Sequence, residues 1–171
     1  MRHSLILHPD CRSGAVERID VEISRAAASL RLDFAVLGDM AALELPPVAA
    51  CERADGLWRH TCFEAFVRPV PGAAYREFNF APSTQWAAYD FDAYRDGMRD
   101  ADAAPKIAIV RDDRQFRLSA AFAVAGSPLR LGLSAVIAGK GGGKSYWALA
   151  HPAGKPDFHH PDCFALELPA A

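Results

Sequence analysis

Apolar and polar residues alternate with a period of two along much of this sequence, and this pattern constrains the fold most strongly. Ile19, Val21 and Ile23, for example, are separated by Asp20 and Glu22. The same alternation recurs in five further segments, residues 30–36, 62–67, 116–123, 129–135 and 164–168. Side chains on a β-strand point to opposite faces in turn, so this pattern predicts strands with one buried face.

Clusters of turn-forming residues separate these segments, and they favour a single all-β domain. Pro46-Pro47, residues 69–72, residues 126–128 and the glycine-rich residues 139–143 each interrupt an apolar run. Short strands at this spacing are typical of an antiparallel β-sandwich. Residues 90–102 are the best helical candidate, but they have little of the 3.6-residue period. We therefore expect one antiparallel β-sandwich domain over residues 1–171, of the immunoglobulin or jelly-roll kind.

Charge and hydropathy exclude several classes of partner. The formal net charge is −2, and Lys, Arg, Asp and Glu are interspersed, so the basic footprint of a nucleic-acid-binding protein is absent. No apolar run has the length of a signal peptide core or of a membrane-spanning helix. These features predict a cytoplasmic protein without a nucleic-acid or membrane partner. The four cysteines are far apart in sequence, and we expect them to be buried free thiols.

The central part of the chain places carboxylates within strand-like segments. If residues 62–67 and 75–80 form neighbouring strands, Glu64 shares a face with Cys62 and Phe66, and Glu77 shares a face with Asn79. Burying a carboxylate without partners is costly, so this face is expected to be solvated or to contact a polar ligand. A solvated face with an internal arginine partner is the alternative.

Aromatic residues near these polar groups suggest a sugar site. Sugars present apolar C–H faces and rings of hydroxyl groups, which flat aromatic rings and carboxylate, amide or guanidinium groups recognise together. Trp58, Trp86, Tyr146 and Trp147 all lie near such polar residues in the sequence. A single tryptophan more often belongs to a core, so the combination carries the prediction.

Three segments of the chain resemble family 9 carbohydrate-binding modules and the related bacterial DOMON-like domains. They are residues 57–66 (LWRHTCFEAF), residues 75–82 (YREFNFAP), and residues 146–149 (YWAL) with 156–159 and 164–168. The resemblance covers the chain from about Leu30 onward and implies a β-sandwich that binds a carbohydrate or another small polar ligand. It implies that Trp58 and Trp147 sandwich a sugar ring and that Glu77 and Asn79 bind its hydroxyl groups. Glu64 and Arg59 complete the expected ligand-binding set.

The resemblance also raises two cofactor alternatives. Some DOMON domains hold haem b between a Met and a His or Lys; Met40 and Met98 are the internal methionines here, and several histidines could be partners, but none falls in a haem-specific motif. Members of the carbohydrate-binding family often carry a structural calcium, for which this chain lacks a dense Asp/Asn loop. We therefore expect no cofactor, with haem b and calcium as alternatives.

The remaining motifs give only weak signals for phosphate binding, metal binding or catalysis. Residues 138–145 fit a relaxed phosphate-loop pattern, but no helix can follow them, so we interpret them as a hairpin loop. His151, His159, His160, Asp162 and Cys163 lack the spacing of a zinc site and are interpreted as loop residues. No nucleophile motif is present. The chain is thus expected to be a non-catalytic binding domain, and the alternative is a glycoside hydrolase that uses Glu64 and Glu77.

Overall fold

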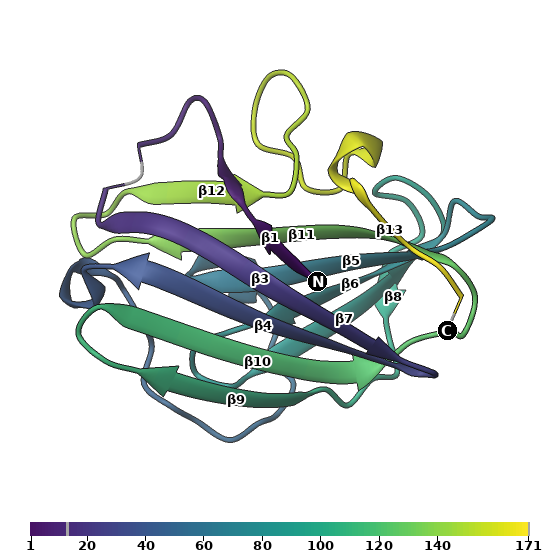
Figure 1. The fold of residues 1–171 in the computed structure, drawn as a ribbon, viewed down its shortest axis with the longest axis horizontal. Helices are drawn as coiled ribbons and strands as arrows, with labels where there is room; N and C mark the ends of the chain where they lie inside the picture. Colours follow the sequence, from purple (N-terminus) through teal and green to yellow (C-terminus); the bar gives the residue numbers. More distant parts are fainter. Residues whose placement is uncertain (13, 171) are drawn as a thin grey trace.

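The alternating segments pair into two antiparallel sheets that pack face to face (Figure 1). The computed structural model describes residues 1–12 and 14–170; the expected domain 1–171 includes two positions, 13 and 171, that lie outside the described residues. The first sheet has the order β1 (Arg2–Ser4), β3 (Val16–Ala26), β4 (Ser29–Gly38), β10 (Gln115–Ala123) and β9 (Lys106–Arg111). The second has the order β2 (Ile6–Leu7), β12 (Lys144–Ala148), β11 (Leu129–Ala138), β5 (Cys62–Pro69), β6 (Tyr75–Phe80), β7 (Trp86–Phe91) and β8 (Arg99–Asp100), and β13 (Leu166–Leu168) also pairs with β11.

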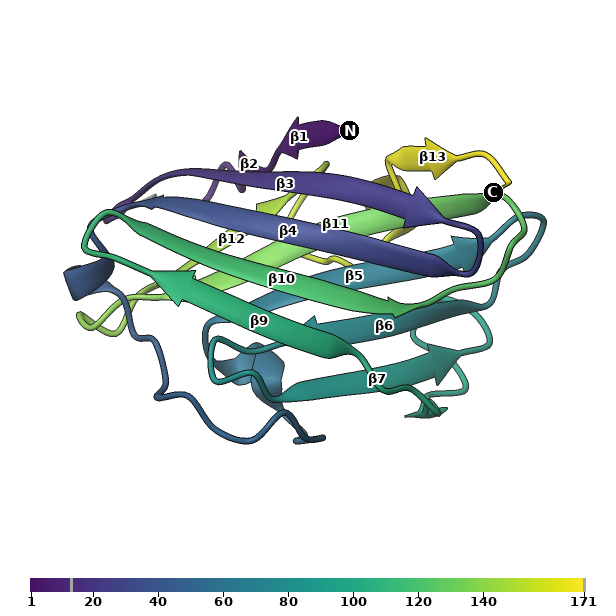
Figure 2. The ribbon, with the colours of Figure 1, turned by 60° about the horizontal axis from the view of Figure 1, so that its bottom comes forward.

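The main core lies between the two sheets. In the β3–β4 hairpin Val21 is opposite Phe34, and both are buried, whereas their neighbours Glu22 and Asp33 point outward. Phe63 of the second sheet packs against Phe34, with ring centroids 5.1 Å apart. Figure 2 shows the first sheet lying across the second, as expected for a sandwich. The predicted all-β antiparallel sandwich is confirmed.

The second sheet is buried on both faces. Strand β5 has Phe63 and Ala65 on its inner face, and Glu64 and Phe66 on its outer face, and all four are buried. The irregular segment of residues 149–165 covers part of the outer face: a Cβ on Gly132 of β11 would lie only 3.0 Å from the carbonyl oxygen of Cys163. A second apolar cluster therefore forms outside the sandwich core; it includes Phe66, Tyr75, Phe91, Phe158 and Phe164.

Helical structure in the described residues is limited to three single turns of 3-10 helix. These are η1 (Met40–Ala42), η2 (Leu57–Arg59) and η3 (Pro161–Cys163). Residues 90–102, the best helical candidate in the sequence, instead form the end of β7, a turn and β8. None of the described helices is long and apolar enough to cross a membrane.

The phosphate-loop-like residues 138–145 connect β11 to β12. Ala138 pairs directly with Lys144 in an antiparallel ladder, so this segment is a hairpin, as predicted. The cysteines correspond only partly to expectation. All four are free thiols, but only Cys62 and Cys163 are buried, and Cys51 is exposed.

Candidate functional site

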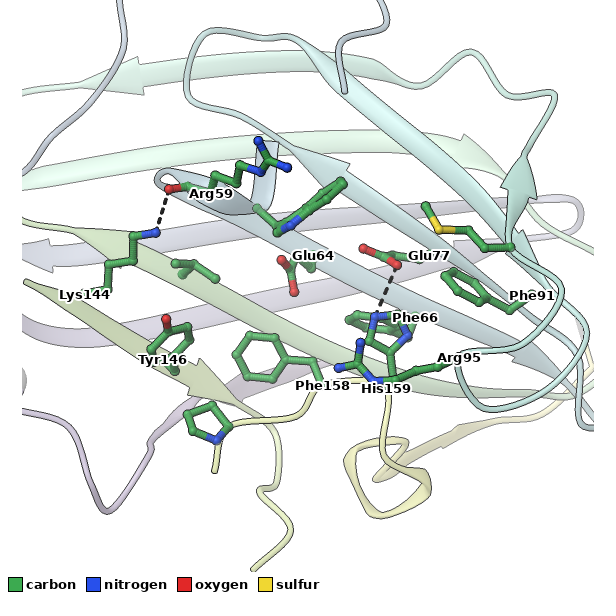
Figure 3. A pocket seen from close by; sticks show the side chains of 14 residues that line it. Arg59, Glu64, Phe66, Glu77, Phe91, Arg95, Lys144, Tyr146, Phe158 and His159 are labelled. Atoms are coloured by element: carbon green, nitrogen blue, oxygen red, sulfur yellow. Dashed lines mark hydrogen bonds and ion pairs between the residues drawn. The ribbon is translucent and has the colours of Figure 1, made fainter. Parts of the chain in front are cut away.

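The register of β5 and β6 brings the two expected carboxylates together on the outer face of the second sheet. Glu64 is opposite Asn79, and Phe66 is opposite Glu77. Glu64 and Glu77 are therefore diagonal neighbours, a position in which long side chains on adjacent strands reach one another. Figure 3 shows both carboxylates pointing into the same cavity.

A cavity of about 500 Å³ lies over these two carboxylates. Its walls come from η2, from the turn between β7 and β8, from β12 and from the covering segment 149–165 (Figure 3). The lining residues are Trp58, Arg59, Glu64, Phe66, Glu77, Phe91, Arg95, Met98, Val136, Lys144, Tyr146, Pro156, Phe158 and His159. Aromatic walls above a polar floor are typical of sites for small organic ligands.

Each floor carboxylate receives one hydrogen bond from the sheet. The Ser134 hydroxyl donates to Glu64 Oε2 over 2.9 Å, and the Asn79 amide donates to Glu77 Oε1 over 2.7 Å. Asn79 itself accepts from the Cys62 thiol, over 3.4 Å. Glu64 is only 3% exposed and Glu77 6%. These bonds fix the carboxylates while leaving the second oxygen of each directed away from its donor.

Burial and mutual repulsion determine the charge of the pair. Burial, with the neighbouring charge of Glu77, raises the pKa of Glu64 to about 8. Burial also raises the pKa of Glu77, while the hydrogen bond from Asn79 acts in the opposite direction. The charge of Glu77 is among the causes of the raised pKa of Glu64, whereas the hydrogen bond from Asn79 and the charge of Arg95 oppose the rise in the pKa of Glu77, so the proton of the pair resides mainly on Glu64. The floor is therefore one carboxylate and one carboxylic acid.

His159 lies beside this pair as a neutral imidazole. The backbone N–H of Arg95 donates to the Tyr75 hydroxyl over 3.2 Å, and that hydroxyl lies 2.8 Å from His159 Nδ1. From these hydrogen bonds we assign the tautomer in which His159 Nδ1 accepts from the Tyr75 hydroxyl and Nε2 carries the ring proton. Nε2 lies 3.6 Å from Glu77 Oε2. Burial, helped by the charge of Arg95, lowers the pKa of His159 to about 4. The imidazole therefore supplies a dipole rather than a charge.

The cationic groups lie at the rim of the cavity. Lys144 Nζ donates to the backbone carbonyl of Arg59 over 2.7 Å, and both side chains are exposed. The guanidinium of Arg95 forms an ion pair with Asp157, with a nitrogen–oxygen distance of 2.7 Å. Among the described residues no arginine or lysine forms an ion pair or hydrogen bond with Glu64 or Glu77, although the nearby charge of Arg95 lowers the pKa of Glu77. Of the alternative, a solvated face with an internal arginine partner, the described residues show only the nearby charge of Arg95 and no direct ion pair.

The structure brings together four of the six residues expected to bind a ligand. Trp58, Arg59, Glu64 and Glu77 line the cavity. Asn79 lies beneath Glu77, fully buried, with both side-chain atoms engaged.

Trp147 occupies a different place from the one expected. Its strand partner is Ala135, a residue of the core between the sheets, and the indole is 5% exposed in that core. Its Nε1 donates to Ser145 over 2.9 Å. The expected pair of facing tryptophans is therefore not formed, because the two lie on opposite sides of the sheet. The adjacent Tyr146, on the outer face, lines the cavity instead.

Several lining residues lay outside the set chosen from the sequence. Tyr146 differs from Trp147 only in the phase of the strand alternation, which the short β12 does not define. Phe158 and His159 belong to an irregular segment, where no periodicity applies. Phe66 shares its face with Glu64, so the alternation of β5 could have identified it.

The residues around the cavity do not fit haem b. Met98 and His159 both line it, but His159 Nδ1 is bonded to Tyr75 and Nε2 faces Glu77, so neither nitrogen is free for an iron. A carboxylate floor also differs from the largely apolar pocket that haem requires. Among residues 1–12 and 14–170, no three His, Cys, Asp or Glu side chains gather as a metal site would require.

Comparison with known proteins supports the fold. No protein-family model matches the sequence, and no curated protein matches it. One similar solved structure is the crystal structure of a proposed carbohydrate-binding protein from Bacteroides uniformis. It has a TM-score of 0.67 and 12% sequence identity, and the alignment covers 95% of this chain and 83% of that one. At this identity the likeness establishes a shared all-β sandwich fold.

Proposed function

We propose that this chain is a non-catalytic binding domain for a small carbohydrate-type ligand, which enters the cavity over Glu64 and Glu77. The observation that carries the proposal is the pairing of aromatic walls with two buried carboxylates on one floor. Aromatic rings contact the C–H faces of a sugar, and fixed carboxylates orient its hydroxyl groups. The similarity in fold to a proposed carbohydrate-binding protein supports the same class of ligand.

The ionised and the protonated carboxyl group of the cavity floor can each form hydrogen bonds with the hydroxyl groups of a sugar. The ionised Glu77 accepts a hydrogen bond from a hydroxyl, whereas the protonated Glu64 can both donate and accept. Ser134 and Asn79 hold the two groups in place before a ligand arrives, which reduces the entropy lost on binding. Trp58, 38% exposed at the cavity wall, supplies an aromatic surface that a ring could cover.

The test is isothermal titration of the protein with a panel of neutral monosaccharides and disaccharides. We expect saturable binding by at least one member and a loss of at least tenfold in affinity in Trp58→Ala. Val110→Ala, at an exposed position on β9 of the other sheet, is the control and should bind as the wild type does. If no sugar binds to the folded wild-type protein, the proposed function is wrong.

A glycoside hydrolase remains a second candidate because of one specific observation. An ionised and a protonated glutamate beside each other are the pair that glycoside hydrolysis uses, as nucleophile or base and as acid. Chromogenic glycosides test this directly. Turnover by the wild type that is lost in both Glu64→Gln and Glu77→Gln would establish catalysis and replace the binding proposal.

A further inference from the structure

The floor of the cavity has two carboxylate oxygens without a hydrogen-bond donor. Glu64 Oε2 accepts from Ser134 and Glu77 Oε1 accepts from Asn79, so one oxygen of each is satisfied. Glu64 Oε1 has no hydrogen bond among the described residues, and Glu77 Oε2 lies 3.6 Å from His159 Nε2, beyond hydrogen-bonding distance. Both carboxylates face the cavity (Figure 3), so a ligand bound there can donate to these two oxygens.

No cationic side chain forms an ion pair with either carboxylate among the described residues, and Arg95, whose charge lowers the pKa of Glu77, is itself paired with Asp157. The charged or titratable groups around the carboxylate pair are Cys62, Tyr75, Arg59, Arg95, Lys144, Tyr146 and His159. His159 is neutral, and Arg95 is engaged with Asp157. A cation between two carboxylates on diagonal positions of adjacent strands would favour ionisation of both below pH 8, where Glu64 otherwise keeps its proton.

The walls also suit a cation. Trp58, Tyr146 and Phe158 line the cavity above the two carboxylates. The faces of aromatic rings carry negative electrostatic potential, and ammonium groups bind over them while the same rings contact the apolar face of a sugar. Aromatic walls with an acidic floor therefore match a ligand that has both a ring and an ammonium group.

We propose that the sugar bound in this cavity is an amino sugar, whose ammonium group lies between Glu64 and Glu77 and donates to their two unbonded oxygens. This inference rests on the proposed function, which it narrows to basic sugars. An ammonium group has three N–H donors, enough for both oxygens and one further acceptor. The neutral hydroxyl of an ordinary sugar can donate to one oxygen only.

Binding of an ammonium group should displace the proton that the pair holds. In the free protein Glu64, with a pKa of about 8, is almost fully protonated at pH 6.5. An ammonium group between the carboxylates favours ionisation of both, so Glu64 should release its proton as the ligand binds. A neutral sugar leaves that proton in place. Proton release therefore distinguishes the two kinds of ligand without any mutation.

The experiment is calorimetric titration at pH 6.5 in two buffers that differ in ionisation enthalpy. Glucosamine, galactosamine and mannosamine are compared with the parent sugars and with the neutral N-acetyl forms. We expect at least one amino sugar to bind tenfold or more tightly than its neutral counterparts, with release of about one proton. Glu64→Gln retains an acceptor for the Ser134 hydroxyl. In this variant proton release should vanish, and the affinity for the amino sugar should exceed that for its neutral counterparts by threefold or less.

The outcomes separate this inference from the proposed function. Equal binding of neutral and amino sugars, without proton release, overturns the inference and supports the general sugar-binding proposal. Binding of ethanolamine as tightly as any amino sugar supports the ammonium site and overturns the sugar part. Absence of binding by every compound overturns both. Glu22→Gln, an exposed carboxylate on β3 of the other sheet, is the control and should behave as the wild type.

Discussion

Replacement of Glu64 by glutamine should change the pH dependence of folding stability. In the unfolded chain Glu64 has an ordinary pKa of about 4.5, and in the folded protein burial and the charge of Glu77 raise the pKa to about 8. Between these two values the folded protein retains a proton that the unfolded chain has lost. Because the unfolded state then binds fewer protons, the free energy of unfolding falls as pH rises through this window and levels off above pH 8.

The magnitude follows from the width of the window. Three and a half pH units at about 1.4 kcal/mol each give a loss of roughly 5 kcal/mol between pH 4.5 and pH 8 for this one group. Glutamine cannot ionise and is nearly the same shape, so Glu64→Gln should lack this loss. The variant should gain roughly 3 to 5 kcal/mol relative to the wild type on going from pH 5 to pH 8.

Urea unfolding followed by tryptophan fluorescence at pH 5, 6, 7 and 8 measures this difference. The raised pKa of Glu77 contributes to the pH dependence of the free energy of unfolding in both proteins. The difference between the wild type and Glu64→Gln therefore reports on Glu64. Glu22→Gln, at an exposed position on β3, should follow the wild type within about 0.5 kcal/mol at every pH. If wild type and Glu64→Gln lose stability in parallel, Glu64 is not protonated in the folded protein and the reasoning fails.

Three further predictions follow from the packing. Trp147→Ala should lower the free energy of unfolding by about 3–5 kcal/mol in chemical denaturation, because the indole lies in the core. Gly132→Ala places a methyl group 3.0 Å from the carbonyl oxygen of Cys163, and calorimetric melting should show a loss of about 1–2 kcal/mol. Iodoacetamide, followed by mass spectrometry, should label the exposed Cys51 first, since burial raises the pKa of the thiols of Cys62 and Cys163.

The sandwich could be predicted from the sequence because the long strands of the first sheet, such as β4 and β10, have one buried and one more polar face. On β3 the buried Ile19, Val21 and Ile23 alternate with polar neighbours, and the period of two determines which side chains enter the core. The edge strand β9 has a weaker signal in the sequence: Ile107 and Ile109 pack against the core, but Ala108 and Val110 on the exposed face are apolar too, so the alternation of apolar and polar residues is lost.

Only those residues of the candidate site that lie on regular strands could be placed from the sequence. Glu64 and Glu77 belong to regular strands with the same outward phase, so their common face follows from alternation. The resemblance to carbohydrate-binding modules implied a site role for Trp147, and alternation could not test it because β12 is five residues long and has adjacent aromatic side chains, Tyr146 and Trp147, on its two faces. Phe158 and His159 reach the cavity from a segment without regular structure, and only the three-dimensional fold places them there.

Small side chains flank Glu64 on the outer face of the second sheet. One row across the outer face of the second sheet consists of Ala148, Ser134, Glu64, Asn79 and Ala87. A row with large residues at the Ser134 and Ala148 positions would fill the space above Glu64, and the covering segment would then pack directly on the sheet. With small residues there the cavity lies over Glu64, and the covering segment helps to keep this side chain only 3% exposed. Burial beneath the covering segment raises the pKa of Glu64, and the cavity at the same place can hold a ligand that displaces the proton.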